Sequence, residues 1–318
     1  MLVIRRLVSI CSAGLMLISG AALAQSYPSK PVRIITAGTG GGNDLTARIL
    51  APGLSAQMGQ SFVVENRPTA GLPEAVAKAP PDGYTLMVYS GGLWLRPFMA
   101  DVTYDPVRDF VPITWAMKSP LAIVVHPSLP VNSVKELIAL AKAKPGTLNY
   151  STGGTGSSTH LAPELFKQIT GTDMVRVPYK SGAQELADLV GGRVQLSFNG
   201  GGTVSGQVKA GKLRALAVTS DGPSELFPGL PTVSSQGVPG YTATQMFGML
   251  GPARLPDAIV RRLSQESVKY LQLESTKQQT LAGGQEVVGS TPEEFAAAIK
   301  ADMARWGKLI KDAGIREE

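Results

Sequence analysis

The chain alternates short apolar blocks with longer amphipathic blocks, and glycine, proline or small polar residues separate them. Short apolar runs rich in valine, isoleucine and leucine predict buried strands, and apolar positions three or four residues apart predict helices. Their alternation predicts parallel sheets flanked by helices. The predicted strands are 32–37, 61–66, 84–90, 121–126, 147–152, 174–179, 194–202, 213–220 and 244–253. The predicted helices are 45–58, 72–79, 133–146, 158–171, 181–192, 256–273 and 291–313.

Local signals fix several helix ends. Ser133 with Glu136 and Thr291 with Glu294 form capping boxes, in which the side chain of each residue bonds the backbone of the other. Pro52 lies inside the helix predicted over 45–58 and is expected to interrupt it, because proline lacks the N–H that an inner helical position donates.

The strand–helix run occurs twice, and the second run lies inside the first. The pattern predicts one domain from residues 27–120 plus 244–318 and a second from 121–243. Two such domains leave a cleft between them, which is where small ligands usually bind.

Residues 1–24 have the pattern of a signal peptide. Two arginines precede an apolar stretch over 7–18, and a small-residue cleavage site ends at Ala24. Cleavage there predicts a mature chain that begins near Gln25. The single cysteine, Cys11, lies within the removed segment. A mature chain without disulfides suits a bacterial periplasm better than a disulfide-rich extracellular scaffold.

Composition then narrows the class of protein. Hydrophobic residues make up 43% of the 318 residues and charged residues 17%, which favours packed cores over disorder. The net charge of +6 is spread along the chain without a basic stripe or a recognition motif. Nucleic acid is therefore not an expected partner.

The segment ITAGTGGGNDLTARIL, residues 35–50, runs from a strand through glycines into a helix. Such a turn leaves N–H groups unpaired at the positive end of the helix dipole, where an anion can bind. It is neither a P-loop nor a dinucleotide fingerprint, because no Lys-Ser pair follows and Asn43 replaces the third glycine. We expect bulk at Gly41 or Gly42 to close this nest or to forbid a left-handed conformation.

A second glycine loop, residues 153–160, lies in the other domain, and a third candidate spans 179–183. Each loop alone fits an ordinary strand-to-helix turn. Their joint presence in both domains favours a receptor that holds one small anion across the cleft.

The sequence does not predict catalysis. Of the two histidines, neither His126 nor His160 has a partner at metal-ligand spacing, and His160 is expected to support its loop. A nucleophile elbow of the Gly-x-Ser-x-Gly type is absent. We predict no catalytic residue, no metal ligand and no cofactor.

The chain resembles the substrate-binding proteins of tripartite tricarboxylate transporters, the Bug-type receptors, from about residue 27 to 315. The segments that carry this resemblance include YPSKPVRII, GGGND, VVENRP, AVAKAPPDGYTL, YDPVRDF, GSSTHLAPELFK, VPYK and GKLRALAVTS. The resemblance implies a type II periplasmic-binding-protein fold, with two α/β domains of parallel-rich sheets joined by crossover strands around a cleft. It also implies a small organic acid as ligand, held by loop amides, hydroxyls and ordered water.

The candidate ligand-binding residues lie in the glycine loops and beside them. They are Gly38, Thr39, Gly40, Gly41, Gly42, Asn43, Asp44, Ser90, Thr152, Gly153, Thr155, Ser157, Ser158, His160, Tyr179, Ser181, Ala183 and Asn199.

Several positions depart from the family pattern. Residues 37–40 replace a proline-rich run, the segment near Gly71 is shorter, and Asn199 stands where aspartate is common. Trp94 is either a core residue or a wall for a ring-bearing ligand. Arg96 is either a surface residue or a clamp for a second carboxylate.

The function predicted is that of a monomeric periplasmic receptor that delivers an organic acid to transmembrane permease subunits. One alternative is a sensor subunit that hands its ligand-bound form to a signalling system. A hydrolase is the other alternative.

Overall fold

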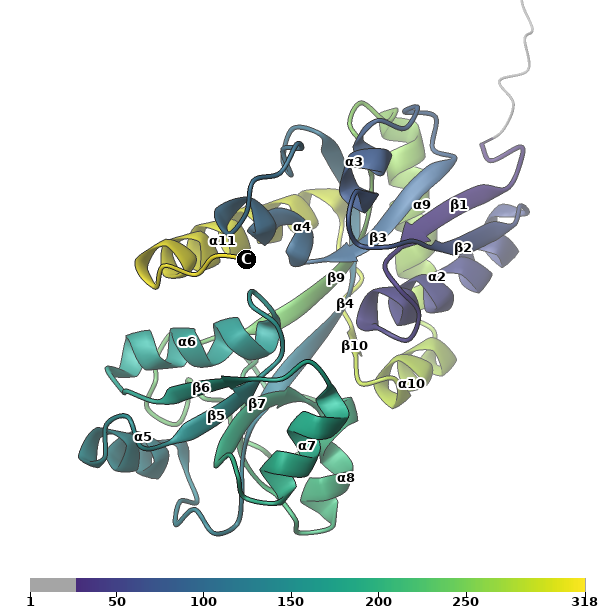
Figure 1. The fold of residues 1–318 in the computed structure, drawn as a ribbon. Helices are drawn as coiled ribbons and strands as arrows, with labels where there is room; N and C mark the ends of the chain where they lie inside the picture. Colours follow the sequence, from purple (N-terminus) through teal and green to yellow (C-terminus); the bar gives the residue numbers. More distant parts are fainter. Residues whose placement is uncertain (1–26, 318) are drawn as a thin grey trace, which may run out of the picture.

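The computed structural model describes residues 27–317, drawn in Figure 1 as two groups of strands and helices at opposite ends of two long central strands. The predicted signal peptide, its cleavage site and Cys11 lie outside the described residues. We call residues 27–120 with 244–317 domain 1 and residues 121–243 domain 2. Every helix within residues 27–317 is too short or too polar to cross a membrane.

Domain 1 is built on a mixed sheet. Strand β1 pairs in parallel with β2 and β3, and β9 then runs antiparallel between β3 and β4. These strands are β1 (Val32–Thr36), β2 (Phe62–Asn66), β3 (Thr85–Ser90), β4 (Phe110–Val125) and β9 (Thr244–Pro252).

Domain 2 continues the strand order from β4 through β7 and β5 to β6, with β8 also pairing with β4. Strand β5 is parallel to both β6 and β7. These strands are β5 (Asn149–Thr152), β6 (Val175–Pro178), β7 (Leu196–Gly200) and β8 (Arg214–Val218).

One strand, β4, belongs to both domains. Pro120 pairs with Thr244 of β9, whereas the next residue, Leu121, pairs with Gly200 of β7. The partner of β4 therefore changes between residues 120 and 121. The fold is the predicted α/β architecture, with largely parallel sheets joined by strands that cross from one domain to the other.

Helices cover both sheets. They are α2 (Gly42–Met58), α3 (Leu72–Ala77), α4 (Gly92–Leu95), α5 (Val134–Ala143), α6 (Ser158–Thr170), α7 (Gly182–Val190), α8 (Gly201–Lys209), α9 (Asp257–Leu271), α10 (Glu274–Ala282) and α11 (Pro292–Asp312). A 3-10 turn, η1 (Arg96–Phe98), and the short strand β10 (Glu286–Val287) complete the elements.

Three sequence predictions are corrected. Helix α2 begins at Gly42 rather than Leu45 and continues through Pro52 without interruption. Helices α8 and α10 and the first part of β4 were not predicted. In contrast, the box at Thr291 is confirmed, since Thr291 Oγ1 accepts from Glu294 N at 3.2 Å and Glu294 Oε2 accepts from Thr291 N at 2.9 Å.

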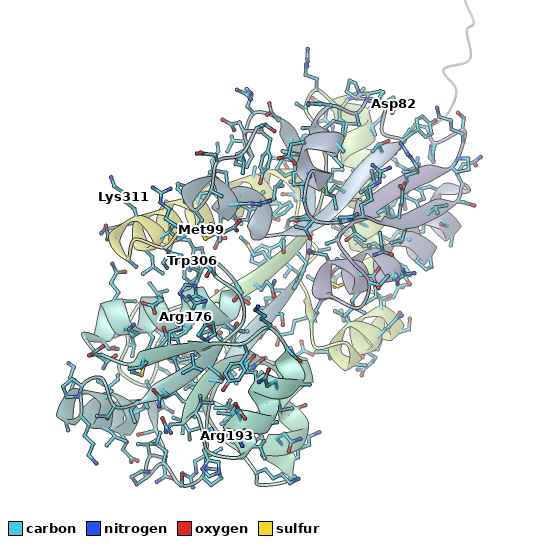
Figure 2. All side chains as sticks on the ribbon, in the orientation of Figure 1. Asp82, Met99, Arg176, Arg193, Trp306 and Lys311 are labelled. Carbon is cyan, nitrogen blue, oxygen red and sulfur yellow. The ribbon has the colours of Figure 1, made fainter. Side chains whose placement is uncertain are left out.

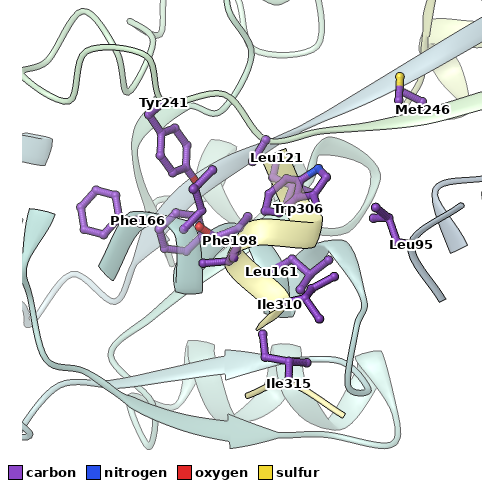
Figure 3. Packing of buried hydrophobic residues seen from close by; sticks show 14 of the residues in the cluster. Leu95, Leu121, Leu161, Phe166, Phe198, Tyr241, Met246, Trp306, Ile310 and Ile315 are labelled. Atoms are coloured by element: carbon purple, nitrogen blue, oxygen red, sulfur yellow. The ribbon is translucent and has the colours of Figure 1, made fainter. Parts of the chain in front are cut away.

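The largest hydrophobic core runs across the boundary between the domains. Trp306 and Ile310 of α11 belong to it together with Leu161 of α6, as Figure 3 shows. Trp94 of α4 is fully buried and contacts the Phe295 ring edge-on, with 6.0 Å between ring centroids. This packing brings α4 and α11 of domain 1 against α6 of domain 2.

Candidate functional site

A pocket of about 180 Å³ lies between the two domains. Domain 1 contributes the end of β3 with α4 and α11, domain 2 contributes the start of α6, and the segment leading into β9 forms the remaining wall. The lining residues are Ser90, Gly91, Gly92, Leu95, Gly156, Ser157, Ser158, Leu161, Ala243, Thr244, Gln245, Met246, Asp302 and Trp306.

The domain 2 wall is the N-terminus of α6. Ser157 is the N-cap residue, and the first turn of this helix contains no acidic residue. Among the described residues, none accepts a hydrogen bond from the amide of Ser158 or Thr159. Unpaired amides and the helix dipole together create a positive potential at this end of the pocket.

The loop that precedes α6 is held by its own polar groups. Gly153 N donates to Thr159 Oγ1 at 2.8 Å, and Gly156 N donates to Nδ1 of the His160 ring at 3.2 Å. Burial, together with the nearby charge of Arg176, lowers the pKa of His160 to about 4. The imidazole is therefore neutral near pH 7 and can accept this bond, so His160 supports its loop.

Arg176 of β6 lies behind the same loop. Its Nε donates to Thr152 Oγ1 at 3.0 Å, and its Nη2 donates to the carbonyl of Gly153 at 3.4 Å. This guanidinium adds positive charge to the domain 2 side of the pocket. Figure 2 labels Arg176 on domain 2 and Trp306 and Met99 on the facing part of domain 1. Arg176 is not among the predicted site residues. Its place near the end of a strand adjacent to a glycine loop is the signal that could have identified it.

The domain 1 wall carries a carboxylate. Asp302 of α11 accepts hydrogen bonds from the indole N–H of Trp94 at 2.7 Å and of Trp306 at 2.8 Å. Burial raises the pKa of the Asp302 carboxyl, and the two indoles and Arg305 offset this only in part. Asp302 is also not among the predicted site residues, because its partner Trp94 lies 208 residues away in the chain.

Ser90 stands at the end of β3, on the same wall. Its side chain is only 8% exposed, and its hydroxyl has no hydrogen-bond partner among residues 27–317. A buried hydroxyl that faces a pocket without a protein partner is available to a ligand or to water.

The glycine loop of α2 is arranged differently. The Asp44 carboxylate accepts hydrogen bonds from Gly40 N at 3.0 Å, from Arg48 Nε at 2.9 Å and from Asn66 Nδ2 at 2.8 Å. Although burial raises the pKa of Asp44, these bonds outweigh it and hold the pKa below its usual value. Asp44 thus supplies an internal anion to one amide of this loop, that of Gly40. Among the described residues, none accepts a hydrogen bond from the amides of Gly42, Asn43 and Asp44.

The prediction for the α2 glycines also needs correction. The left-handed residue is Gly40, with φ of 82°, whereas Gly41 has φ of −88° and ψ of 171°. Gly42 is helical, and a Cβ there would lie 2.5 Å from the ring of Phe247. Close packing, not a left-handed backbone, therefore requires glycine at position 42.

Of the predicted ligand-binding set, Ser90, Ser157 and Ser158 line the pocket. The remaining residues lie outside its wall, and several are occupied by protein partners. The Tyr179 hydroxyl donates to Asp188 Oδ2 at 2.9 Å, and buried Asn199 donates from Nδ2 to Glu185 Oε1 at 3.0 Å. The other residues outside the wall are Gly38, Thr39, Gly40, Gly41, Gly42, Asn43, Asp44, Thr152, Gly153, Thr155, His160, Ser181 and Ala183.

The two alternatives for the 94–96 segment are resolved. Trp94 is a core residue whose N–H reaches the pocket carboxylate. Arg96 is paired with Glu317, with 3.0 Å between Nε and Oε2, and it does not line the pocket. Among residues 27–317, no cluster of three or more His, Cys, Asp or Glu side chains is arranged to hold a metal ion.

The chain is similar to known solute receptors. The model of the tripartite tricarboxylate transporter family receptor matches residues 46–315. Protein BugT of Bordetella pertussis is 32% identical over 300 residues, which cover 92% of this chain and 92% of BugT.

Solved structures agree with this match. Rpa4515 of R. palustris, solved with adipate, is 36% identical with a TM-score of 0.75, covering 91% of this chain and 99% of that one. A TctC solute binding protein from Polaromonas is 27% identical with a TM-score of 0.82, covering 90% of this chain and all of that one. The chain therefore belongs to the receptor family of the tripartite tricarboxylate transporters.

Proposed function

We propose that this receptor captures a small carboxylate in the pocket between its domains and delivers it to the permease subunits of its transporter. The observation that carries the proposal is the start of α6, where Ser157 and Ser158 line the pocket, the amides of Ser158 and Thr159 have no protein acceptor, and Arg176 adds charge behind the loop. Rpa4515, with bound adipate, supports the same ligand chemistry.

The expected strength of this contact follows from its donors. A hydrogen bond to a charged group contributes about 1.5–3 kcal/mol, and the helix dipole adds about 0.3–1 kcal/mol. Since about 1.4 kcal/mol changes affinity tenfold, the loss of one amide donor is measurable.

The same contacts argue against catalysis. The ring nitrogen Nδ1 of His160 accepts from Gly156 N, and Ser157 Oγ lies 3.1 Å from Thr159 Oγ1 rather than beside a base. A nucleophile needs a base within hydrogen-bond reach. The protein we propose is a binding protein, exported to the periplasm by the segment that ends at Ala24 and acting there as a monomer.

Calorimetry on the Ser158→Pro variant tests the proposal. Proline is tolerated at the first helical position, and the extended backbone of Ser157, with ψ of 159°, accommodates a following proline. The change removes one amide donor, so affinity for carboxylates should fall about tenfold or more. Aliphatic mono-, di- and amino-carboxylates are the probes.

Two controls accompany this experiment. Ser158→Ala keeps the amide and should bind within about threefold of the wild-type protein. Glu274→Pro makes the same change at the first position of α10, remote from the pocket, and should leave affinity unchanged. A wild-type protein that binds no carboxylate, or a folded Ser158→Pro variant with wild-type affinity, would contradict the proposal.

A further inference from the structure

The pocket between the domains has ends of opposite charge. Its domain 2 end holds the α6 amides backed by Arg176, and its domain 1 end holds the Asp302 carboxylate. Between them the wall includes the apolar side chains of Leu95, Leu161 and Met246. No lysine or arginine lines this pocket in the described chain.

Asp302 has no protein cation to pair with. Its hydrogen bonds come from two neutral indoles, and no lysine or arginine among residues 27–317 lies within ion-pair distance of it. The nearest charge that acts on it is Arg305, which is exposed and donates to the carbonyl of Thr242 at 3.1 Å. Lys118, in a neighbouring hollow that Asp302 also borders, is paired with Glu286 at 3.5 Å.

A charged carboxylate that is shielded from water is unfavourable unless hydrogen-bond donors or a cation interact with it. The two indoles fix its orientation and leave further lone pairs on both oxygens. Asp302 is thus a fixed acceptor at one end of the ligand pocket, and Ser90 supplies an unpaired hydroxyl nearby on the same wall.

We propose that the ligand carries an ammonium group as well as a carboxylate, with the ammonium paired to Asp302 and the carboxylate held by the α6 amides. This assignment rests on the proposed function and names its substrate class as small amino acids. A second carboxylate in the ligand would instead face Asp302, and like charges at close range repel.

The size of the pocket sets the size of the ligand. A cavity of roughly 150 Å³ takes one benzene molecule. The pocket here, at about 180 Å³, has room for a short amino acid and little more. The expected ligands therefore have short aliphatic chains between or beside the two charges.

Calorimetry with matched probes tests the assignment. One series is γ-aminobutyrate, α-aminobutyrate, butyrate and succinate, and a shorter series is β-alanine, alanine, propionate and malonate. In at least one series an amino acid should bind about tenfold more tightly than both the monoacid and the diacid of the same length. The ranking in the wild-type protein decides the question by itself.

The Asp302→Asn variant identifies the residue responsible. Asparagine keeps one acceptor for an indole and removes the charge, so amino-acid affinity should fall about tenfold while monoacid affinity stays within about threefold. Affinity for the diacid should rise. Asp257→Asn is the matched control, because that side chain is 85% exposed and far from the pocket lining.

The outcomes are distinguishable. If monoacids or diacids bind as tightly as the amino acids, or if a folded Asp302→Asn variant keeps the wild-type ranking, the amino-acid assignment is overturned and the carboxylate receptor stands. If no probe with a carboxylate binds, the proposed function fails and the assignment fails with it.

Discussion

The glycine loops at the starts of α2 and α6 are similar in sequence, but only the α2 loop has an acidic residue in the first turn of its helix. Both follow a strand, contain several glycines and begin a long helix. The α2 loop closes on the carboxylate of Asp44, which accepts from Gly40 N. The α6 loop has no acid in its first turn, and Gly156, Ser157 and Ser158 line the pocket between the domains.

The difference teaches a rule for interpreting such loops. A helix N-terminus attracts an anion, and a first-turn acid of the same chain supplies one at high local concentration. The α2 loop therefore has a carboxylate of its own that accepts from one of its amides, whereas the α6 loop has none. An acid in the first turn is the sequence feature that separates the two cases.

The largest expected effect concerns packing in the α2 loop. In Gly42→Ser the new Cβ would lie 2.5 Å from the buried Phe247 ring, so the free energy of unfolding should fall by about 1–3 kcal/mol. Gly41→Ser is the matched control, because the nearest atom to a Cβ there is Gly38 O at 3.9 Å. Its stability should change by less than about 0.5 kcal/mol, measured by denaturant unfolding.

The Gly41→Ser variant also tests whether the α2 loop binds the ligand. Gly41→Ser should also bind ligand with unchanged affinity if the α2 loop is closed. A stable Gly41→Ser protein that loses about tenfold in affinity would mean that the α2 amides hold the ligand after all.

Removal of the Asp44 carboxylate should lower the stability of the protein moderately. Asp44→Ala loses the bonds to Gly40, Arg48 and Asn66 and should cost about 1–2 kcal/mol of stability near pH 7. The folded-state pKa of Asp44 is lowered, so its contribution is present above the unfolded pKa, about 3.9, and is lost as the pH falls through the folded pKa. Unfolding curves at several pH values should show this difference shrink in acid.

Asp257→Ala provides the comparison for Asp44. It also lies in the first turn of a helix, α9, but is exposed and contacts only Arg261 at 3.5 Å. Its removal should change stability by less than about 0.5 kcal/mol. Equal losses in the two variants would show that Asp44 acts as an ordinary first-turn acid.

The smallest expected effect concerns the α6 loop. His160→Gln keeps an acceptor for Gly156 N and should match wild-type stability at pH 8 within about 0.5 kcal/mol. Because the pKa of His160 falls from 6.5 to about 4 on folding, the wild-type protein loses stability as the pH falls from 6.5 through 4. The variant lacks this loss, so parallel acid-dependence curves for the two proteins would show that His160 is not buried and neutral.

Most of the fold could be predicted because its elements are locally encoded. Apolar runs such as β1 and β3 bury nearly every residue, and the α11 cap is a local interaction. The first part of β4 was missed because Pro112 and Pro120 argue against a strand, whereas long pairing with β9 and a short pairing with β10 hold it in place. Helix α8 was missed because its glycines disfavour a helix, which packing of buried Val204 stabilises.

Only the site residues that belong to one continuous sequence motif could be predicted. Ser157 and Ser158 follow directly from the glycine loop at the start of α6. Asp302 and Arg176 acquire their roles from tertiary packing, which brings α11 against α4 and β6 against β5. The pattern around Asp302 does not distinguish it from a solvent-exposed charge, and Arg176 is marked only by its place near the end of a predicted strand.

The two indoles that hold Asp302 also make the site optically visible. The chain has three tryptophans, and two of them, Trp94 and Trp306, donate to this single carboxylate. The third, Trp115, donates to the carbonyl of Met117. Indole emission responds to charge beside the ring, so a cation that enters next to Asp302 perturbs two of the three native fluorophores at once. Binding of the proposed ammonium ligand should therefore change the native tryptophan fluorescence, which would report occupancy without a label.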